Sequence, residues 1–213
     1  KKSEFREISL LAEKKRIASV CVDKQTLYKL SGSRQHQGMV GEVSDYLYNS
    51  NDQLSLAVQN NNKIILLFLD GLQDPGNFGS IIRTAVAFGI THLVISKNRC
   101  CPVTGGVFKS SVGTIEKVNI YRVSNLATTA RVLKKMGVWF YGASPITDKT
   151  LAQQDFILPC ALVIGAEGHG IGRSMEKILD FNFFISMQNE VESLNASQVF
   201  AIIAYSLQEK LEL

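Results

Sequence analysis

The chain has 213 residues, of which 46% are hydrophobic and 20% charged, a balance that is typical of folded proteins and excludes extensive disorder. Its formal net charge of +4 and isoelectric point of about 8.8 tolerate a polyanionic partner but do not by themselves indicate one. No apolar run reaches the roughly 18 residues that span a bilayer, and no signal peptide is visible, so we expect a cytoplasmic protein with no membrane contact.

The pattern of cysteine and histidine predicts neither a disulfide framework nor a metal centre. The four cysteines show no Cys-x-x-Cys spacing, and the three histidines are scattered along the chain. Metal sites need clustered ligands, and the adjacent Cys100 and Cys101 are poorly placed to bridge each other. We therefore expect reduced thiols, as is usual in the cytosol, and no metal.

The first 48 residues predict a small domain of their own. Two short β-like runs, at residues 18–22 and 39–43, flank a polar loop at residues 31–38. Polar clusters at residues 49–52 and 59–62 are typical of a domain boundary, so we expect a linker at residues 49–62. The chain begins with Lys1 rather than Met, from which we expect an N-terminal piece to be missing.

From residue 63 onward the pattern changes to alternating strands and helices. Residues 64–69 form a continuous apolar run, typical of a strand that is buried on both faces. We expect further strands at residues 92–96, 118–121, 138–141, 161–164 and 183–185. We expect helices at residues 126–136, 173–179 and about 193–211, the last packed against the sheet or a second subunit. This alternation predicts a mostly parallel α/β sheet with helices on both faces, over residues 63–213.

The first polar motif follows the first of these strands. Residues 74–77, Asp-Pro-Gly-Asn, are compatible with an ordinary turn, and Asn77 can cap the helix that follows. Arg83 lies about two turns into that apolar helix, where a charged side chain is costly unless its head reaches solvent or an anion. A guanidinium group there is suited to a bidentate phosphate contact.

The second motif is the glycine-rich run at residues 165–172. It lacks the register of the dinucleotide fingerprint, and no acidic residue ends a strand some 20 residues later, which disfavours a nicotinamide oxidoreductase. Two interpretations stay open: a loop whose amides bind an adenosine-like ligand while Glu167 orients a polar group, or a plain connector with Glu167 in solvent. We expect His169 to be exposed.

The third motif, Ser-Leu-Asn-Ala-Ser at residues 193–197, opens the last helix. Ser193 is interpreted first as the N-cap, which leaves the polar head of Asn195 free to face a ligand. Together, the three motifs resemble the signature blocks of the SpoU branch of the SPOUT superfamily of RNA ribose 2′-O-methyltransferases. The run at residues 121–127 resembles the bacterial 23S rRNA guanosine-2′-O-methyltransferase group. The matching positions are Asp74, Pro75, Asn77, Gly79, Arg83, Thr84, Ala85, Lys109, Ser111, Gly113, Gly165, Glu167, Gly168, Gly170, Ser193, Leu194, Asn195 and Ser197.

The resemblance implies a fold, a cofactor and partners. It implies a C-terminal trefoil knot, a small L30e-like RNA-binding α/β domain before it, a homodimer, and S-adenosylmethionine bound in a bent form. The implied cofactor-binding residues are Gly165, Ala166, Glu167, Gly168, Ile185, Met187, Ser193, Leu194 and Asn195. The implied RNA-binding residues are Arg34, His36, Gln37, Lys109 and Ser111. One departure is Ser186, which stands where the family usually has proline; it makes this loop less rigid and predicts weaker cofactor affinity.

The implied reaction transfers a methyl group from a sulfonium to a ribose 2′-hydroxyl, with catalytic residues Asn77, Arg83, Glu167, Ser193 and Asn195. The family assigns removal of the hydroxyl proton to the residue matching Arg83. A guanidinium group hardly deprotonates, so we interpret Arg83 as gripping the adjacent phosphate and polarising the hydroxyl. The presence of an N-terminal domain favours 23S rRNA as the substrate. A tRNA ribose methyltransferase and a non-catalytic RNA-binding homologue stay open as alternatives.

Overall fold

The computed structural model describes residues 2–32, 34, 36–144, 147–188 and 193–211. It divides into two compact units, Lys1–Asp45 and Tyr46–Leu213. The segment expected as a linker, residues 49–62, contains helix α3 (Asn51–Asn60), which lies in the second unit and buries Leu54 and Val58. Ser50 and Gln53 form a reciprocal capping box at its start.

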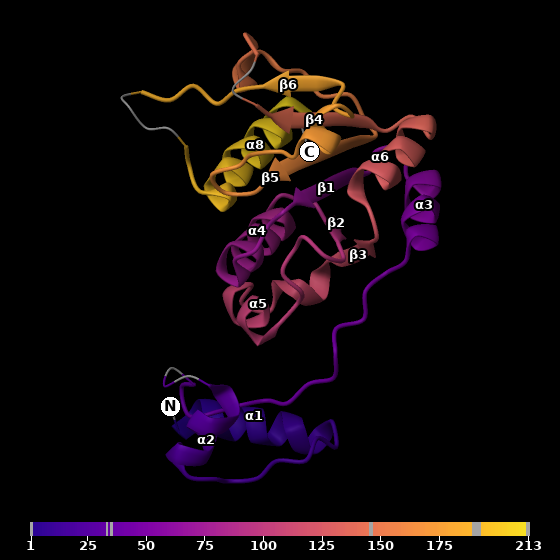
Figure 1. Ribbon diagram of the computed structural model, residues 1–213. Helices are drawn as coiled ribbons and strands as arrows, with labels where there is room; N and C mark the ends of the chain where they lie inside the picture. The colour runs from indigo at the N-terminus through magenta and orange to yellow at the C-terminus, as the bar shows by residue number, and fades with distance from the viewer. Residues whose placement is uncertain (1, 33, 35, 145–146, 189–192, 212–213) are drawn as a thin grey trace. The chain divides into compact units, whose positions relative to one another are not determined.

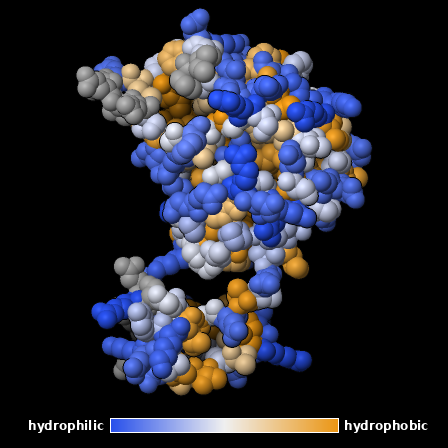
Figure 2. All heavy atoms as spheres, in the orientation of Figure 1, coloured by the Kyte–Doolittle hydropathy of each residue, from blue (hydrophilic) through white to orange (hydrophobic). Residues whose placement is uncertain are grey.

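The described part of the N-terminal unit contains two helices, α1 (Lys2–Lys14) and α2 (Lys24–Ser31). The carboxylate of Asp23 caps α2 by accepting from the Thr26 amide at 2.7 Å. The two runs expected to be β-like pair with no strand in the described part of this unit, and Val20 and Val43 are 82% and 69% exposed. A β-ladder needs a neighbouring backbone to accept its hydrogen bonds, so these runs stay irregular. Figure 2 shows hydrophobic side chains at the surface of this unit.

The second unit is built on a parallel sheet, as expected. Its described strands are β1 (Ile65–Asp70), β2 (His92–Ser96), β3 (Asn119–Val123), β4 (Trp139–Ala143), β5 (Cys160–Gly165) and β6 (Phe181–Phe183). They lie in the order β3-β2-β1-β5-β4-β6, and each of the five described pairings is parallel. The last strand ends two residues earlier than expected, because Phe183 pairs with Ala143, the last residue of β4.

Helices cover both faces of this sheet (Figure 1). On one face, Leu67 and Leu69 pack in the cluster that contains Phe78 of α4 (Pro75–Ala87) and Phe200 of α8 (Ala196–Leu211). The opposite face carries α3, α6 (Leu126–Lys135) and α7 (Arg173–Glu176), and Phe68 belongs to its cluster. Because β1 is buried on both faces, it is apolar throughout except for its last residue. The remaining described elements are α5 (Gly105–Ser110), η1 (Thr114–Lys117) and η2 (Leu151–Gln153).

The strand order places the ends of two distant strands side by side. The chain runs outward from β1 to β2 and β3, returns through α6, and inserts β5 between β1 and β4. Asp70 at the end of β1 is in register with Gly165 at the end of β5. A reversal of strand order of this kind opens a crevice at the carboxyl ends of the strands, where α/β proteins bind ligands.

A short segment covers the free edge of β3. The Asn49 amide donates to the Ile120 carbonyl at 2.9 Å, and the Arg122 amide donates to the Asn49 carbonyl at 3.3 Å. The Arg122 guanidinium lies 5.0 Å from the centre of the Tyr48 ring, and the Val103 amide donates to the Tyr48 hydroxyl at 2.7 Å. We call residues 46–49 the edge segment; it belongs to the second unit.

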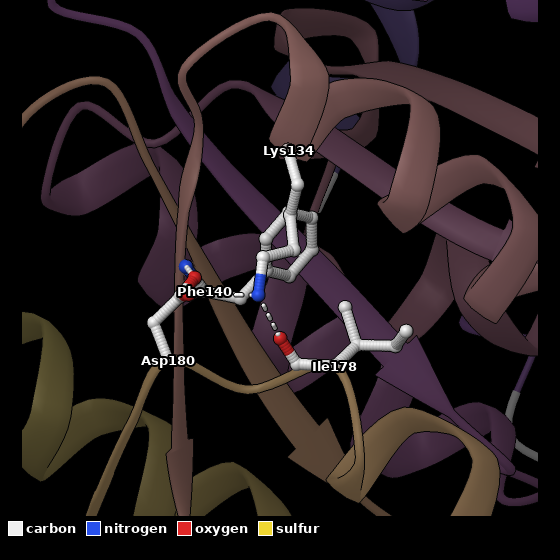
Figure 3. A network of polar contacts seen from close by, with 4 residues as sticks. All are labelled: Lys134, Phe140, Ile178 and Asp180. Carbon is white, nitrogen blue, oxygen red and sulfur yellow. Dashed lines mark hydrogen bonds and ion pairs between the residues drawn. The ribbon is translucent and has the colours of Figure 1, made fainter.

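A partly buried ion pair joins α6 to the turn before β6, close to the start of β4 (Figure 3). The Lys134 ammonium lies 2.7 Å from an Asp180 carboxylate oxygen and donates to the Ile178 carbonyl at 2.7 Å. The other Asp180 oxygen accepts from the Phe140 amide at 2.9 Å. Asp180 therefore joins α6, β4 and the turn before β6.

Replacing Asp180 by alanine should lower the free energy of unfolding by about 2–3 kcal/mol, because a partly buried amide and ammonium lose their partner together. Urea unfolding of the wild type and the variant measures this loss. Asp148→Ala is the matched control, since this carboxylate is exposed and has no partner among the described residues, and it should change stability by less than about 0.5 kcal/mol. Equal losses in the two variants would contradict the role given to Asp180.

Candidate functional site

The first motif forms the N-terminus of α4, with a different cap from the one expected. Asp74 is the N-cap, and its carboxylate accepts from the Asn77 amide at 2.6 Å. Pro75 follows in the first turn, where its missing N–H and fixed φ suit a helix start. The expectation that Asn77 caps this helix is therefore wrong. Asn77 lies inside the first turn, and its side-chain amide remains available for contacts outside the helix.

The third motif caps α8 through Asn195 rather than Ser193, which corrects the second expected cap. The Asn195 side-chain oxygen accepts from the Ser197 amide at 2.8 Å and from the Ser197 hydroxyl at 2.6 Å. Of the two polar atoms of an asparagine side chain only the oxygen can accept from a backbone N–H, so this contact determines which way the Asn195 amide points. Its NH₂ group must face away from the helix, toward the other motifs.

Three hydrogen bonds join the three motifs into one network. The Asn77 NH₂ group donates to Glu167 Oε1 at 2.8 Å. The Asn195 NH₂ group donates to the same Glu167 oxygen at 2.6 Å and to the Asn77 side-chain oxygen at 2.9 Å. We call Asn77, Glu167 and Asn195 the amide–carboxylate network. Each motif contributes one member, so its assembly requires the loops after β1 and β5 and the start of α8 to be in place together.

Glycine allows the loop after β5 to fold back on itself. The Ala166 amide donates to the Gly170 carbonyl at 3.1 Å, and the Gly170 amide donates to the Ala166 carbonyl at 2.9 Å. A Cβ atom on Gly165 would lie 2.1 Å from the Gly170 carbonyl carbon, which excludes any side chain at this position. The Gly172 amide donates to the buried Asp70 carboxylate at 2.9 Å. The loop is thus held at its far end by β1 and in its middle by the amide–carboxylate network.

A cavity of about 600 Å³ lies beside this loop. Eight of the nine expected cofactor-binding residues line it, and they come from three separate segments: Gly165, Ala166, Glu167, Gly168, Ile185, Met187, Ser193 and Leu194. The ninth, Asn195, is absent from the lining, although its neighbour Ala196 is present. The volume of this cavity lies in the range of small-molecule sites. Its walls combine backbone amides with apolar side chains.

The cavity also has lining residues that sequence reasoning did not identify. Ala143 and Ser144 come from the end of β4, and Arg173 and Glu176 come from α7. Their proximity depends on β4 being the neighbour of β5. The only sequence signal for the lining residues of β4 was the strand-like run that ends near residue 141, and such a run does not reveal the order of the strands in the sheet.

Arg83 lies exposed on α4, with no hydrogen bond or ion pair to any described residue. One turn earlier, a Cβ atom on Gly79 would lie 1.9 Å from the Ser110 hydroxyl oxygen. That hydroxyl donates to the Pro75 carbonyl at 2.9 Å, so α5 packs directly on the first turn of α4. The Arg83 guanidinium is available to an anion that approaches this helix.

The expected RNA-binding residues are divided between the two units. In the N-terminal unit, the Arg34 guanidinium lies 5.9 Å from the centre of the Tyr28 ring, and His36 Nδ1 accepts from the Gly38 amide at 3.0 Å. Gln37 is exposed and has a φ of 53°.

In the second unit, Lys109 is exposed at the end of α5. Ser111 has 0% of its surface exposed. Its hydroxyl donates to the Phe108 carbonyl at 3.0 Å, within the turn that ends α5. The Ser111 side chain therefore supports that turn and does not reach the surface.

Two buried cysteines outside the network, Cys100 and Cys160, hold their protons more tightly than a free thiol does. Burial raises the pKa of the Cys160 thiol to about 12, and a hydrogen bond with Cys101, together with burial, raises the pKa of Cys100. All four cysteines are free. Within the described residues, no group of His, Cys, Asp or Glu side chains could hold a metal ion, and no described helix is long and apolar enough to span a membrane.

Replacing Asn195 by aspartate should break the amide–carboxylate network while preserving the cap, because aspartate caps helices as well as asparagine does. The new carboxylate would face Glu167 Oε1, which lies 2.6 Å from the Asn195 NH₂ nitrogen. Like charges this close favour proton binding in the folded state. Stability should therefore be lowered at neutral pH and recover as the pH falls toward about 4. Melting temperatures at several pH values measure this trend. The control Asn98→Asp, in an exposed turn, should show no such recovery, and a pH-independent loss in Asn195→Asp would contradict the network.

Comparison with known proteins supports the chain's family assignment. Residues 64–205 match the model of the SpoU rRNA Methylase family, and residues 1–49 match that of RNA 2′-O ribose methyltransferase substrate binding. YacO of Bacillus subtilis (strain 168), assigned to the TrmH family of tRNA/rRNA methyltransferases, is 37% identical over 210 residues, covering 98% of this chain and 84% of that one. A Staphylococcus aureus (strain COL) protein assigned to the same family is 38% identical over 213 residues, covering 99% and 85%.

Solved structures agree on the fold. A protein of Porphyromonas gingivalis assigned to the TrmH family of RNA methyltransferases superposes with a TM-score of 0.62 and 30% identity, over 69% of this chain and 60% of that one. The SpoU methyltransferase AviRb from Streptomyces viridochromogenes, in complex with AdoMet, gives a TM-score of 0.64 and 24% identity, over 71% and 59%. This chain therefore spans about 60% of the length of these two solved chains. Because the family model matches most of its length and relatives share more than a third of its residues, the chain belongs to the SpoU rRNA Methylase family and is an RNA methyltransferase of the SpoU/TrmH type.

Proposed function

We propose that the protein transfers a methyl group from S-adenosylmethionine to the 2′-hydroxyl of an RNA ribose, and that its substrate is a guanosine of 23S rRNA. The amide–carboxylate network carries this proposal, because it joins the three motifs through side-chain hydrogen bonds, and the second and third of them line one cavity. We place this activity in the cytoplasm.

The cavity has the properties that a nucleoside cofactor requires. Its apolar lining, including Ile185 and Leu194, suits an adenine ring. The backbone of residues 165–170 offers polar groups at its edge, close to Glu167. The bound cofactor would supply a sulfonium methyl group, which is already an activated electrophile. AviRb, which shares this fold, was solved with AdoMet bound. Ser186 lies between the lining residues Ile185 and Met187, and a serine there leaves the backbone freer than the proline that the family resemblance would place at this position.

Positioning is the main catalytic effect in such a transfer, because the attacking oxygen must lie in line with the methyl carbon. Arg83 is exposed and unpaired among the described residues, so its guanidinium can clamp the phosphate next to the target ribose. Asn77 and Asn195 hold Glu167 in place, and Ser193 lines the cavity with it. The target ribose would therefore lie between α4 and the loop after β5.

Two observations support an RNA substrate. The N-terminal unit matches a substrate-binding model of RNA 2′-O ribose methyltransferases, and it presents Arg34, His36 and Gln37 as polar contacts. Lys109 adds an exposed cation on the second unit. The separate N-terminal unit favours rRNA. The alternative substrate is tRNA, because the names of the curated relatives include both RNAs.

We also propose that the protein acts as a homodimer. The outer face of α8 exposes Ile202 and Tyr205 by 38% and 57%, and the Tyr205 ring contacts Phe88 of the α4 end. Apolar side chains adjacent on one surface favour association. Sedimentation equilibrium should therefore give twice the chain mass of 23.5 kDa, and Ile202→Glu should shift the protein toward the monomer. A monomeric wild type would refute this assembly.

Replacing Arg83 by alanine should lower turnover by about 10²-fold or more, as for loss of a positioned catalytic group, while S-adenosylmethionine affinity changes little. The assay measures transfer of labelled methyl to 23S rRNA, 16S rRNA and tRNA that lack their own modifications. The control Arg131→Ala removes an exposed arginine from α6, on the opposite face of the sheet, and should keep full activity.

Each result of that assay bears on a different part of the proposal. Label on 23S rRNA alone, lost in Arg83→Ala, supports both the enzyme class and the substrate. Label on tRNA alone keeps the reaction and overturns the substrate. Full turnover in Arg83→Ala would remove this residue from the site, and no transfer to any RNA would favour the binding homologue.

A further inference from the structure

The proposed reaction requires a group that accepts the proton of the ribose 2′-hydroxyl. We propose that the Glu167 carboxylate accepts it, through its Oε2 oxygen. This assignment rests on the proposed methyl transfer and gives the carboxylate a chemical role beyond its place in the amide–carboxylate network.

The two oxygens of Glu167 have different surroundings. Oε1 accepts from both the Asn77 and the Asn195 NH₂ groups, at 2.8 and 2.6 Å. Oε2 has no hydrogen-bond partner among the residues that the structure describes. Glu167 is exposed and lines the cavity, so Oε2 can meet a hydroxyl group there. Two donors on one oxygen hold the carboxylate still while its other oxygen stays open, an arrangement that suits a base that must meet a substrate hydroxyl.

The other members of the site are poorer proton acceptors. A guanidinium group, such as that of Arg83, offers five N–H donors and no acceptor. The Asn77 and Asn195 side-chain oxygens already accept from Asn195 and Ser197, and an amide is too weak a base for this step. Glu167 is the only carboxylate in the network.

Other ionisable groups lie near the cavity. His169, Arg173 and Glu176 line it from the same loop and from α7, and Asp74 lies beneath Asn77. The described first turn of α8, residues 196–199, contains no ionisable side chain. Glu176 comes from α7, whose residues pack on the opposite face of the sheet from α4. His169 is the strongest rival, because a neutral imidazole can accept a proton.

The step balances in atoms and charge. The 2′-hydroxyl gives its proton to Glu167 Oε2 as its oxygen electron pair forms the new bond to the methyl carbon. The bond between that carbon and sulfur breaks, and its electron pair stays on sulfur, which becomes a neutral thioether. One carboxylate and one sulfonium are consumed, and one carboxylic acid and one thioether are formed. The carboxylic acid returns its proton to water when the products leave.

The deciding variant is Glu167→Gln. Its side-chain oxygen can accept from the same two NH₂ groups, so the network keeps its geometry, but the group that replaces Oε2 can no longer accept a proton. We expect single-turnover methyl transfer, measured at saturating S-adenosylmethionine so that a change in cofactor binding does not count, to slow by about 10²-fold or more. A melting temperature near that of the wild type shows that the variant is folded. The control Asp52→Asn makes the same change at an exposed carboxylate on α3 and should keep full activity.

The pH dependence separates a base from a positioning group. If Glu167 accepts the proton, the wild-type rate should rise on the acid side as the carboxyl group ionises and then stay level, and Glu167→Gln should lose that rise. If a guanidinium accepts it, the wild-type rate should keep rising at alkaline pH.

Three outcomes would overturn the assignment. The first is Glu167→Gln retaining a third or more of the wild-type rate, which would leave Glu167 as a positioning residue. The second is a wild-type rate that keeps rising at alkaline pH. The third is a 10²-fold loss of rate in His169→Gln, together with loss of the rise in rate on the acid side of the pH profile. That result would make the His169 imidazole the proton acceptor. A wild type that binds S-adenosylmethionine but methylates no RNA would instead refute the proposed function, and the two failures are thereby distinguished.

Discussion

The parallel pairing of β1 with β5 is the contact on which the rest of the site depends. These strands lie far apart in the chain, yet their last residues, Asp70 and Gly165, are in register. The polar loops that follow them must therefore emerge side by side, and the buried apolar strands beneath keep them there. A shift of one residue in this register would turn the alternating side chains of β5 to the wrong faces and separate the two loops.

The glycine-rich loop shows how a flexible composition can give a defined geometry. Glycine loses more backbone freedom on folding than other residues do. That cost is offset here by contacts at three places: the Asp70 carboxylate, the Ala166–Gly170 pair, and the amide donors on Glu167. Because two of these three contacts come from β1, α4 and the residue before α8, the loop takes this geometry when the sheet and both helices are assembled. Site formation and folding of the second unit are in this sense one event.

Much of the second unit could be predicted from the sequence, because buried strands appear as apolar runs and the helices between them have their own periodicity. The parallel sheet and the approximate strand positions follow from that alternation. The exact caps could not be predicted. Asp74 and Asn195 displaced Asn77 and Ser193 because several polar residues at each helix start can cap it, and tertiary contacts decide among them. Neither the burial of Ser111 nor the contribution of β4 to the cavity has a local signal, since both depend on which elements become neighbours.

The edge segment belongs to the sheet unit, although it directly follows the N-terminal unit in the chain. Asn49 occupies the open side of β3, and Tyr48 packs against Arg122 of the same strand. A domain exchange that cut the chain after these residues would leave β3 with unpaired amides and carbonyls, which is a template for aggregation between copies. During evolution or engineering, a new N-terminal module could replace residues 1–45 as long as residues 46–49 travel with the sheet. The part of the chain that must be kept together with the sheet would then begin at Tyr46, ahead of the first strand.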